Sequence, residues 1–221
     1  MTTIDILDDY SIMDILENST NDDLVEHSLV NTRWQILASR VFIARIRRDG
    51  LVFSSPTDTI FSFMRVASRF ATEIAEHLTT VKFFGQMTIH SMMDCSQFCD
   101  ILPIYQPFEG ITNVWFTIEG GLPTYNYGPG MLSALMHLAI NHNRIERLYV
   151  NIDWASSHVT EWSNHIFSFI GQTDEMIRAE RIVRIYCNNN TMSLELLLIL
   201  DDANSLDNFS FRFIPCDLTL L

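Results

Sequence analysis

Residues 7–39 read LDDYSIMDILENSTNDDLVEHSLVNTRWQILAS, and this stretch decides how the first part of the chain folds. Ile12, Ile15, Leu16 and Ser19 recur in it at helical spacing on one face. Ser11, with Asp14 three residues later, resembles a capping box and predicts the start of the first helix. Asn21, followed by two Asp residues, predicts the start of a second helix. A third helix is predicted over 31–45. The residues expected on its inner face are Trp34, Leu37, Val41 and Ala44.

Three short helices in about forty residues form a small core, and such a module commonly leaves an apolar surface for a partner to cover. The ordered set of motifs resembles the F-box, the helical module that docks a protein onto a Skp-family adaptor and so onto a cullin ubiquitin ligase. The usual F-box runs Leu-Pro-Asp/Glu, an apolar helix, Asp-Leu, Ser-Leu-Val and Arg-Trp. The matching residues are Leu7, Asp9, Ile12, Met13, Ile15, Leu16, Asp23-Leu24, Ser28-Leu29-Val30 and Arg33-Trp34.

Two positions depart from the F-box pattern. Asp8 stands where the family has Pro, and His27 stands where the family usually has an apolar residue. The Leu-Pro turn normally lies in the adaptor interface, so Asp8 bears on the affinity for the adaptor rather than on the fold. The alternative is an ordinary helical bundle that binds no partner.

The resemblance implies that the N-terminal helices bind the adaptor and that the chain catalyses nothing itself. It also implies a cytoplasmic or nuclear protein, or both, with no cofactor and no metal. The residues expected to contact the adaptor are Leu7, Ile12, Ile15, Leu16, Leu24, Leu29, Val30 and Trp34.

A pattern of apolar-x-x-apolar-x-apolar repeats after the first 77 residues, with starts 33, 34, 37 and 24 positions apart. Three positions after the last apolar residue, the first four copies have a polar residue: Gln86, Glu119, Asp153 and Asn190. The fifth copy has Ile214 there, which breaks the series. The pattern resembles the leucine-rich repeat, although the spacing is mostly longer and uneven. The instances are Leu78/Val81/Phe83, Ile111/Val114/Phe116, Ile145/Leu148/Val150, Ile182/Ile185/Cys187 and Leu206/Phe209/Phe211.

Helices are predicted between these strands, over 87–102, 129–143, 158–180 and 191–205, and a further helix over 58–76 leads into the repeats. Alternating strands and helices predict an α/β fold with parallel strands and right-handed crossovers. The resemblance implies stacked units, a short irregular solenoid arc with its helices outside. The expected division is an F-box-like module over 1–46, a linker over 47–57 with a turn at Asp49-Gly50, and a repeat region of about five strands over 58–221.

The fifth position of each repeat strand is expected to point away from the core. These positions hold Lys82, Trp115, Tyr149, Tyr186 and Ser210, so aromatic rings would lie side by side on three strands. Arginines occupy the third positions of two of these strands. Aromatic residues and arginine dominate protein interfaces. The alternative is that these rings support each other or pack under a loop. The residues expected to contact a target protein are Trp115, Tyr149, Tyr186, Arg147 and Arg184.

Composition excludes several classes of partner. The chain has 27 acidic and 14 basic residues, a net charge of −13, which disfavours nucleic acid and anionic membranes. The most apolar run, over 194–200, is far shorter than the about 20 residues of a membrane helix. Four cysteines suggest free thiols in a reducing compartment. Cys95 and Cys99 lie one helical turn apart, and with no second ligand pair we expect core thiols rather than a metal site.

No catalytic fingerprint for nucleotide, hydrolase or metalloprotease chemistry occurs in the sequence. The function that the F-box resemblance implies is a substrate-recognition subunit of an SCF-type ubiquitin ligase, bound to an adaptor and through it to a cullin, with an unknown target on the repeats. A scaffold with the same fold acting outside the ligase is the alternative. A hydrolase using Asp153 and His158 is a weaker one.

Overall fold

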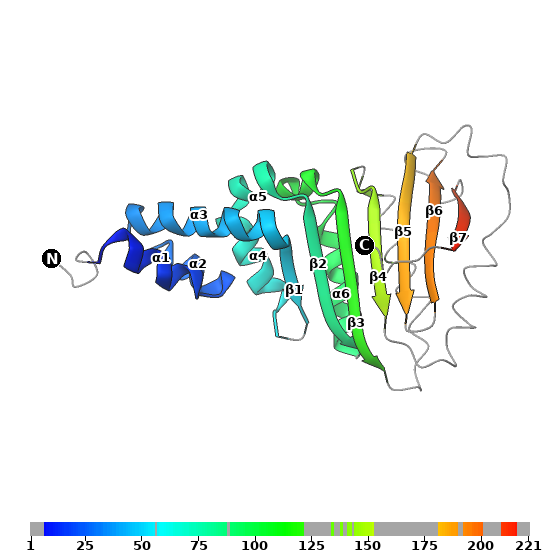
Figure 1. Ribbon diagram of the computed structural model, residues 1–221, viewed down its shortest axis with the longest axis horizontal. Helices are drawn as coiled ribbons and strands as arrows, with labels where there is room; N and C mark the ends of the chain where they lie inside the picture. Colours follow the sequence, from blue (N-terminus) through cyan, green and yellow to red (C-terminus); the bar gives the residue numbers. More distant parts are fainter. Residues whose placement is uncertain are drawn as a thin grey trace.

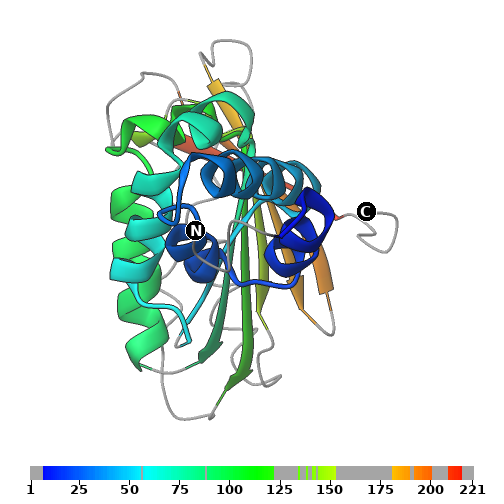
Figure 2. The same cartoon turned by 90° about the vertical axis from the view of Figure 1, so that its left-hand side faces the viewer.

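The computed structural model describes residues 7–55, 57–87, 89–121, 134, 138, 141–142, 144–152, 181–189, 192–200 and 209–215 of the 221-residue chain. The chain is an α/β protein built on a seven-stranded sheet with strand order β1 to β7. Three N-terminal helices extend from the β1 edge of this sheet (Figure 1). The turned view shows that the helices preceding and following β2 lie on one face of the sheet (Figure 2).

The three predicted N-terminal helices are present as α1 (Asp9–Glu17), α2 (Asn21–His27) and α3 (Thr32–Asp49). Their starts differ from the prediction. Asp8 caps α1, because its carboxylate accepts a 2.7 Å hydrogen bond from the backbone N–H of Ser11. Thr20 caps α2 in a capping box with Asp23. The predicted caps Ser11 and Asn21 are therefore wrong, since a better-placed acceptor precedes each of them.

The three helices share a core of side chains that repeat at helical spacing. Trp34, Leu37 and Val41 lie in it as predicted, whereas Ala44 is exposed. Ala44 falls outside the stripe because the later part of α3 turns Phe42 and Ile46 inward instead. The buried residues of this module are Ile12, Leu16, Leu24, Val25, Trp34, Leu37, Ala38, Val41, Phe42 and Ile46.

One arginine ties the end of α1 to α3. The Arg45 guanidinium donates hydrogen bonds to the carbonyl oxygens of Leu16, Glu17 and Ser19, at 2.9, 3.0 and 2.6 Å. It also donates to Oδ1 of Asn21, at 3.1 Å. The last carbonyls of a helix have no partner within the helix, so a cation there satisfies them and complements the helix dipole.

The predicted linker contains a strand, β1 (Leu51–Ser54), which pairs in parallel with β2 (Thr80–Met87). Leu51 and Phe53 are buried in it. Gly50 connects α3 to β1 with a φ of +77°, and a Cβ there would lie 2.5 Å from the carbonyl oxygen of Thr80. The junction is therefore part of the core. The strand was not predicted because four residues are too few to show a clear alternation.

Two helices, α4 (Ile60–Arg69) and α5 (Ala71–His77), replace the single helix predicted over 58–76. Helix α6 (Ile89–Ile101) and a short 3-10 helix (Gln106–Gly110) then connect β2 to β3 (Asn113–Gly121). The strands β4 (Arg147–Ile152) and β5 (Arg181–Asn189) follow, and β1 to β5 are all parallel. The first four predicted strands are thus confirmed, with the predicted residues in register.

The last two strands differ from the prediction. Residues 191–205, predicted as a helix, contain β6 (Met192–Leu200), which is antiparallel to β5. The segment predicted as a fifth parallel strand contains β7 (Phe209–Pro215), which is antiparallel to β6. A continuous apolar run cannot be assigned to helix or strand by periodicity alone, and here it pairs on both edges. The predicted helix over 158–180 lies outside the described residues, as does most of the one over 129–143.

One hydrophobic core connects the N-terminal helices with the sheet. Phe42 of α3 stacks on Phe70 at 4.2 Å between ring centroids. Phe53 of β1 packs edge-on against Phe63 of α4 and stacks on Phe83 of β2. Each buried phenylalanine removes about 150–250 Å² of surface from water, so this chain of rings stabilises the connection between the two parts strongly.

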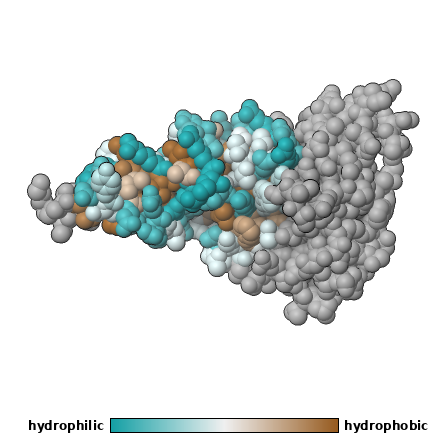
Figure 3. All heavy atoms as spheres, viewed as in Figure 1, coloured by the Kyte–Doolittle hydropathy of each residue, from teal (hydrophilic) through white to brown (hydrophobic). Residues whose placement is uncertain are grey.

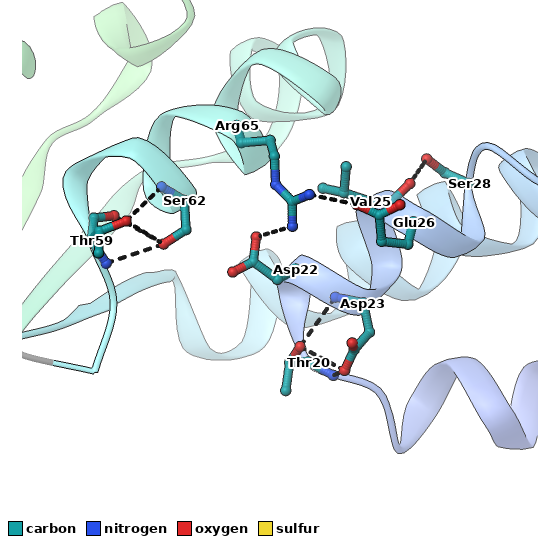
Figure 4. A network of polar contacts seen from close by, with 9 residues as sticks. All are labelled: Thr20, Asp22, Asp23, Val25, Glu26, Ser28, Thr59, Ser62 and Arg65. Carbon is teal, nitrogen blue, oxygen red and sulfur yellow. Dashed lines mark hydrogen bonds and ion pairs between the residues drawn. The ribbon is translucent and has the colours of Figure 1, made fainter.

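Polar contacts reinforce the same connection where α4 meets α2 (Figure 4). The Arg65 guanidinium forms ion pairs with Asp22 at 2.7 Å and Glu26 at 2.5 Å. One turn later, Arg69 donates from Nε to the hydroxyl of Ser28 at 2.6 Å and from Nη2 to its carbonyl oxygen at 3.0 Å. Ser28 is buried, whereas the Arg65 pairs are open to solvent.

Arg69→Ala is expected to lower the free energy of unfolding by about 1–3 kcal/mol, because it leaves buried polar atoms of Ser28 without their donor. Arg65→Ala, on the same helix, is the matched control and is expected to cost only about 0–1 kcal/mol. Urea denaturation of the two variants measures the difference. Equal losses would show that the buried contact contributes no more than the exposed ion pairs.

Candidate protein-binding surfaces

The structure divides the eight residues predicted to bind an adaptor into three groups by burial. Ile12, Leu16, Leu24 and Trp34 are buried, the most exposed of them at 4 %. Leu7 is partly buried against the core. The side chains of Ile15, Leu29 and Val30 are 39 %, 64 % and 44 % exposed. Only the exposed group, Ile15, Leu29 and Val30, can meet a partner without rearrangement of the helices.

Helix geometry and chain direction explain this division. Ile12 and Leu16 are four residues apart, so they share the inner face of α1, whereas Ile15 lies beside that face. Leu29 and Val30 follow the end of α2 in the turn before α3, where no helical face directs them to the core. The F-box resemblance assigned all of these residues to the adaptor contact without separating buried from exposed ones.

Two further apolar side chains on the same helices are exposed, Tyr10 at 89 % and Ile36 at 49 %. We refer to Tyr10, Ile15, Leu29, Val30 and Ile36 as the N-terminal apolar set. Nine large apolar side chains are exposed within the described ranges, and five of these belong to this set. Figure 3 shows hydrophobic residues among hydrophilic ones over the end formed by α1 to α3.

Acidic residues are concentrated in the same segment of the sequence as most of the N-terminal apolar set. Residues 1–32 contain eight Asp and Glu and no Lys or Arg. The pKa of Asp8 is lowered, mainly by the backbone N–H of Ser11, and the pKa of Asp23 is lowered by the Thr20 hydroxyl. Arg33 pairs with Asp9 at 2.6 Å across α1 and α3. A partner with basic residues around an apolar centre would complement this end of the molecule.

Trp34 is buried among the helices rather than exposed on their surface. Its ring centroid lies 5.4 Å from that of His27. His27 stands at the position where the F-box pattern usually has an apolar residue, and here its half-buried ring packs on the indole. Trp34 thus lies on the inner side of α3 with Leu37 and Val41, as the helical spacing predicted, and its burial keeps it from contacting an adaptor in this arrangement.

The second candidate surface lies on the face of the sheet opposite to α6. The register pairs Lys82 with Trp115, Trp115 with Tyr149 and Tyr149 with Tyr186. The rings of Trp115 and Tyr149 stack at 3.8 Å between centroids with an interplanar angle of 11°. Both side chains are partly exposed.

The arginines predicted beside these rings also have the predicted register. Arg147 pairs with Asn113 on one side and with Arg184 on the other. The side chain of Arg147 is exposed. Ser210 does not belong to this row, because it lies on β7 and pairs with Ile199 of β6.

The remaining candidate sites have little support. Cys95 and Cys99 are buried on α6, and burial together with Cys95 raises the pKa of the Cys99 thiol. Among the described residues, no group of His, Cys, Asp and Glu could hold a metal ion. Asp153 and His158 lie outside the described residues. Within the part of the chain that the structure describes, no helix is long and apolar enough to cross a membrane.

Comparison with protein-family models, with curated proteins and with solved structures finds no match to this chain. The assignment of function therefore rests on the residues and their arrangement.

Proposed function

We propose that the chain is a substrate-recognition subunit of an SCF-type ubiquitin ligase. In this proposal α1 to α3 form an F-box that binds a Skp-family adaptor, and the sheet belongs to a short, irregular solenoid related to leucine-rich repeats. The target protein binds the sheet face that carries Trp115 and Tyr149. The chain contributes proximity, which raises the effective concentration of target lysines near the ubiquitin carrier.

The concentration of exposed apolar side chains on α1 to α3 is the observation that carries the proposal. A solvent-exposed turn that holds adjacent Leu29 and Val30, with Ile36 following on α3, costs hydrophobic free energy unless a partner covers it. The same helices carry the ordered F-box motifs, including Ser28-Leu29-Val30 and Arg33-Trp34. Both observations concern the same stretch of chain.

The continuous core supports the proposal because it fixes the positions of the two proposed binding surfaces. Helix α4 binds α2 through Arg65 and Arg69, and α3 runs directly into β1. An adaptor on α1 to α3 and a target on the sheet would therefore be held at a fixed separation. A fixed separation favours transfer to those target lysines that lie within reach of the carrier.

The second candidate is a scaffold that keeps the fold but acts outside the ligase, and the role of Asp8 favours it. The usual Pro would lie in the adaptor interface, whereas Asp8 places a carboxylate there and uses it to cap α1. A charge at an apolar interface weakens binding unless it is paired. The presence of Asp8 bears on the affinity for the adaptor and not on the fold.

Asp8→Pro is expected to strengthen adaptor binding, by up to about tenfold, through removal of the charge and a more rigid turn. The φ of Asp8, −74°, is compatible with proline. The loss of the cap is expected to cost about 1 kcal/mol of stability. Isothermal titration of a purified Skp-family adaptor measures the change, with Asp8→Ala as the control that loses the same cap and charge but gains no proline ring. Weaker binding by Asp8→Pro than by Asp8→Ala would contradict a Leu-Pro-like contact.

Affinity purification with mass spectrometry tests the proposed function in cells. The tagged chain is expected to recover an adaptor and a cullin together with candidate targets. The double variant Leu29→Ser, Ile36→Ser should lose the adaptor and cullin but keep the targets. Recovery of targets by the unaltered chain without adaptor or cullin would favour the scaffold.

A further inference from the structure

The sheet face opposite to α6 has a charge balance unlike that of the rest of the chain. Three rows of paired residues cross β2 to β5 on alternate positions. These twelve positions hold three basic residues and no acidic one, whereas acidic residues outnumber basic ones by 27 to 14 in the whole chain. The rows are Thr80-Asn113-Arg147-Arg184, Lys82-Trp115-Tyr149-Tyr186 and Phe84-Thr117-Asn151-Asn188.

The described side chains of these rows reach solvent. Lys82, Trp115 and Tyr149 are partly exposed and Arg147 is exposed. The alternating residues of the same strands, among them Val114 and Leu148, are fully buried on the other side. Strand alternation therefore separates a basic, aromatic face from the core.

The stacked rings form a platform with positive charge on two sides. Trp115 and Tyr149 lie nearly parallel at 3.8 Å. Lys82 lies one strand away from Trp115, and Arg147 lies two residues before Tyr149 on β4. Adjacent strands are about 4.8 Å apart, so a single extended segment can contact the rings and both cations.

We propose that this face binds an acidic, extended segment of a partner protein. Carboxylates or phosphates of the segment pair with Lys82 and Arg147, and an apolar side chain covers the Trp115–Tyr149 platform. The inference rests on the proposed function, because the segment is the part of the target that the chain reads. It adds the chemical class of that segment, which is negatively charged.

Acidic residues beside the proposed site also limit the length of the segment that can bind. In the next row Gln86 of β2 pairs in register with Glu119 of β3, and Glu195 of β6 pairs in register with Tyr186. On the other side, Arg48 lowers the pKa of the Asp49 carboxyl most, and Lys82 lies close enough to that carboxyl to lower its pKa as well. A long polyanion such as a nucleic acid would extend past these acidic positions on a chain of net charge −13, whereas a short acidic segment would not.

Fluorescence anisotropy of the full-length chain with labelled synthetic peptides tests the inference. The probes are a Glu-rich peptide with one Trp, a version with phosphoserine in place of Glu, a Lys-rich version and single-stranded oligo-dT. The Glu-rich and phosphoserine peptides are expected to bind, with an affinity that falls as salt rises. The relative affinity of these two distinguishes carboxylate from phosphate as the source of the charge.

Two variants locate the binding. Arg147→Glu is expected to weaken the acidic peptides about tenfold, and Trp115→Ala about thirtyfold. Arg40→Glu, an exposed charge reversal on α3, is the matched control and should change nothing. Arg147 is exposed, so its variant remains informative if Trp115→Ala does not fold.

Lys82 provides an independent readout because it is the only lysine in the chain. Acetylation of its amine, followed by mass spectrometry with the α-amine as internal reference, is expected to slow when an acidic peptide is present. Equal binding of acidic and basic peptides, tighter binding of oligo-dT, or an unchanged Arg147→Glu variant would each overturn the inference. Adaptor binding by the same preparation separates these outcomes from failure of the proposed function.

Discussion

Trp34→Ala is expected to lower the free energy of unfolding by about 3–5 kcal/mol, because it removes a large side chain from a close-packed core. Trp34 is only 4 % exposed and packs beside His27. A loss of this size is a large part of the stability of a typical domain, so we expect partial unfolding at physiological temperature. Thermal and urea denaturation followed by circular dichroism measure it.

Ile36→Ala on the same helix is the matched control, since Ile36 is 49 % exposed. We expect it to change stability by no more than about 0.5 kcal/mol. If Trp34→Ala instead kept its stability and lost only adaptor binding, the indole would be an interface anchor. The three helices would then have to rearrange when the adaptor binds.

The double variant Leu29→Ser, Ile36→Ser is expected to weaken binding to a purified Skp-family adaptor at least about hundredfold. Each truncation removes an apolar contact worth about 1.5–3 kcal/mol when covered by a partner. The net charge does not change, so the effect reports apolar burial rather than electrostatics. Isothermal titration gives the affinity, and a denaturation curve on the same preparation should match that of the unaltered chain.

Phe61→Ser provides the matched control for this result. Phe61 is 77 % exposed, but it lies on α4 outside the N-terminal apolar set. Its replacement is expected to leave adaptor binding unchanged. An equal loss in Phe61→Ser would mean that binding depends on general surface hydrophobicity and not on this particular set.

The parallel strands could be predicted because their sequence pattern is repeated. Val81, Val114 and Leu148 occupy the same place in three repeats, and all three are buried at paired positions in neighbouring strands. The same pattern predicted that Trp115 would lie beside Tyr149, and the two rings are stacked. Repetition makes register predictable, since each copy constrains the next.

The antiparallel end of the sheet could not be predicted in the same way. Strand β6 contains five leucines, which favour helix intrinsically, and only its pairing with β5 and β7 decides its structure. The role of Arg45 could not be predicted either. Its partners, the carbonyl oxygens at and just after the end of α1, come within reach only when the two helices pack together. Contacts of this kind depend on tertiary structure.

The F-box resemblance placed the candidate adaptor surface on the N-terminal helices, and residue type alone could not show which of the named side chains are exposed. Apolar type could not separate Leu24, which is fully buried, from Leu29, which is 64 % exposed. The difference arises because α2 ends between them, at His27. Tyr10 and Ile36 were not among the residues expected to contact the adaptor, although Ile36 follows Trp34 where the F-box pattern has apolar residues, and both side chains are exposed.

Titration calorimetry of the purified full-length chain with a purified Skp-family adaptor tests the central claim most directly. The predicted result is a one-to-one complex with a Kd of about 1 μM or tighter and a negative heat-capacity change, as apolar burial requires. No detectable heat or complex formation by a chain that unfolds cooperatively would contradict the claim that α1 to α3 form an F-box.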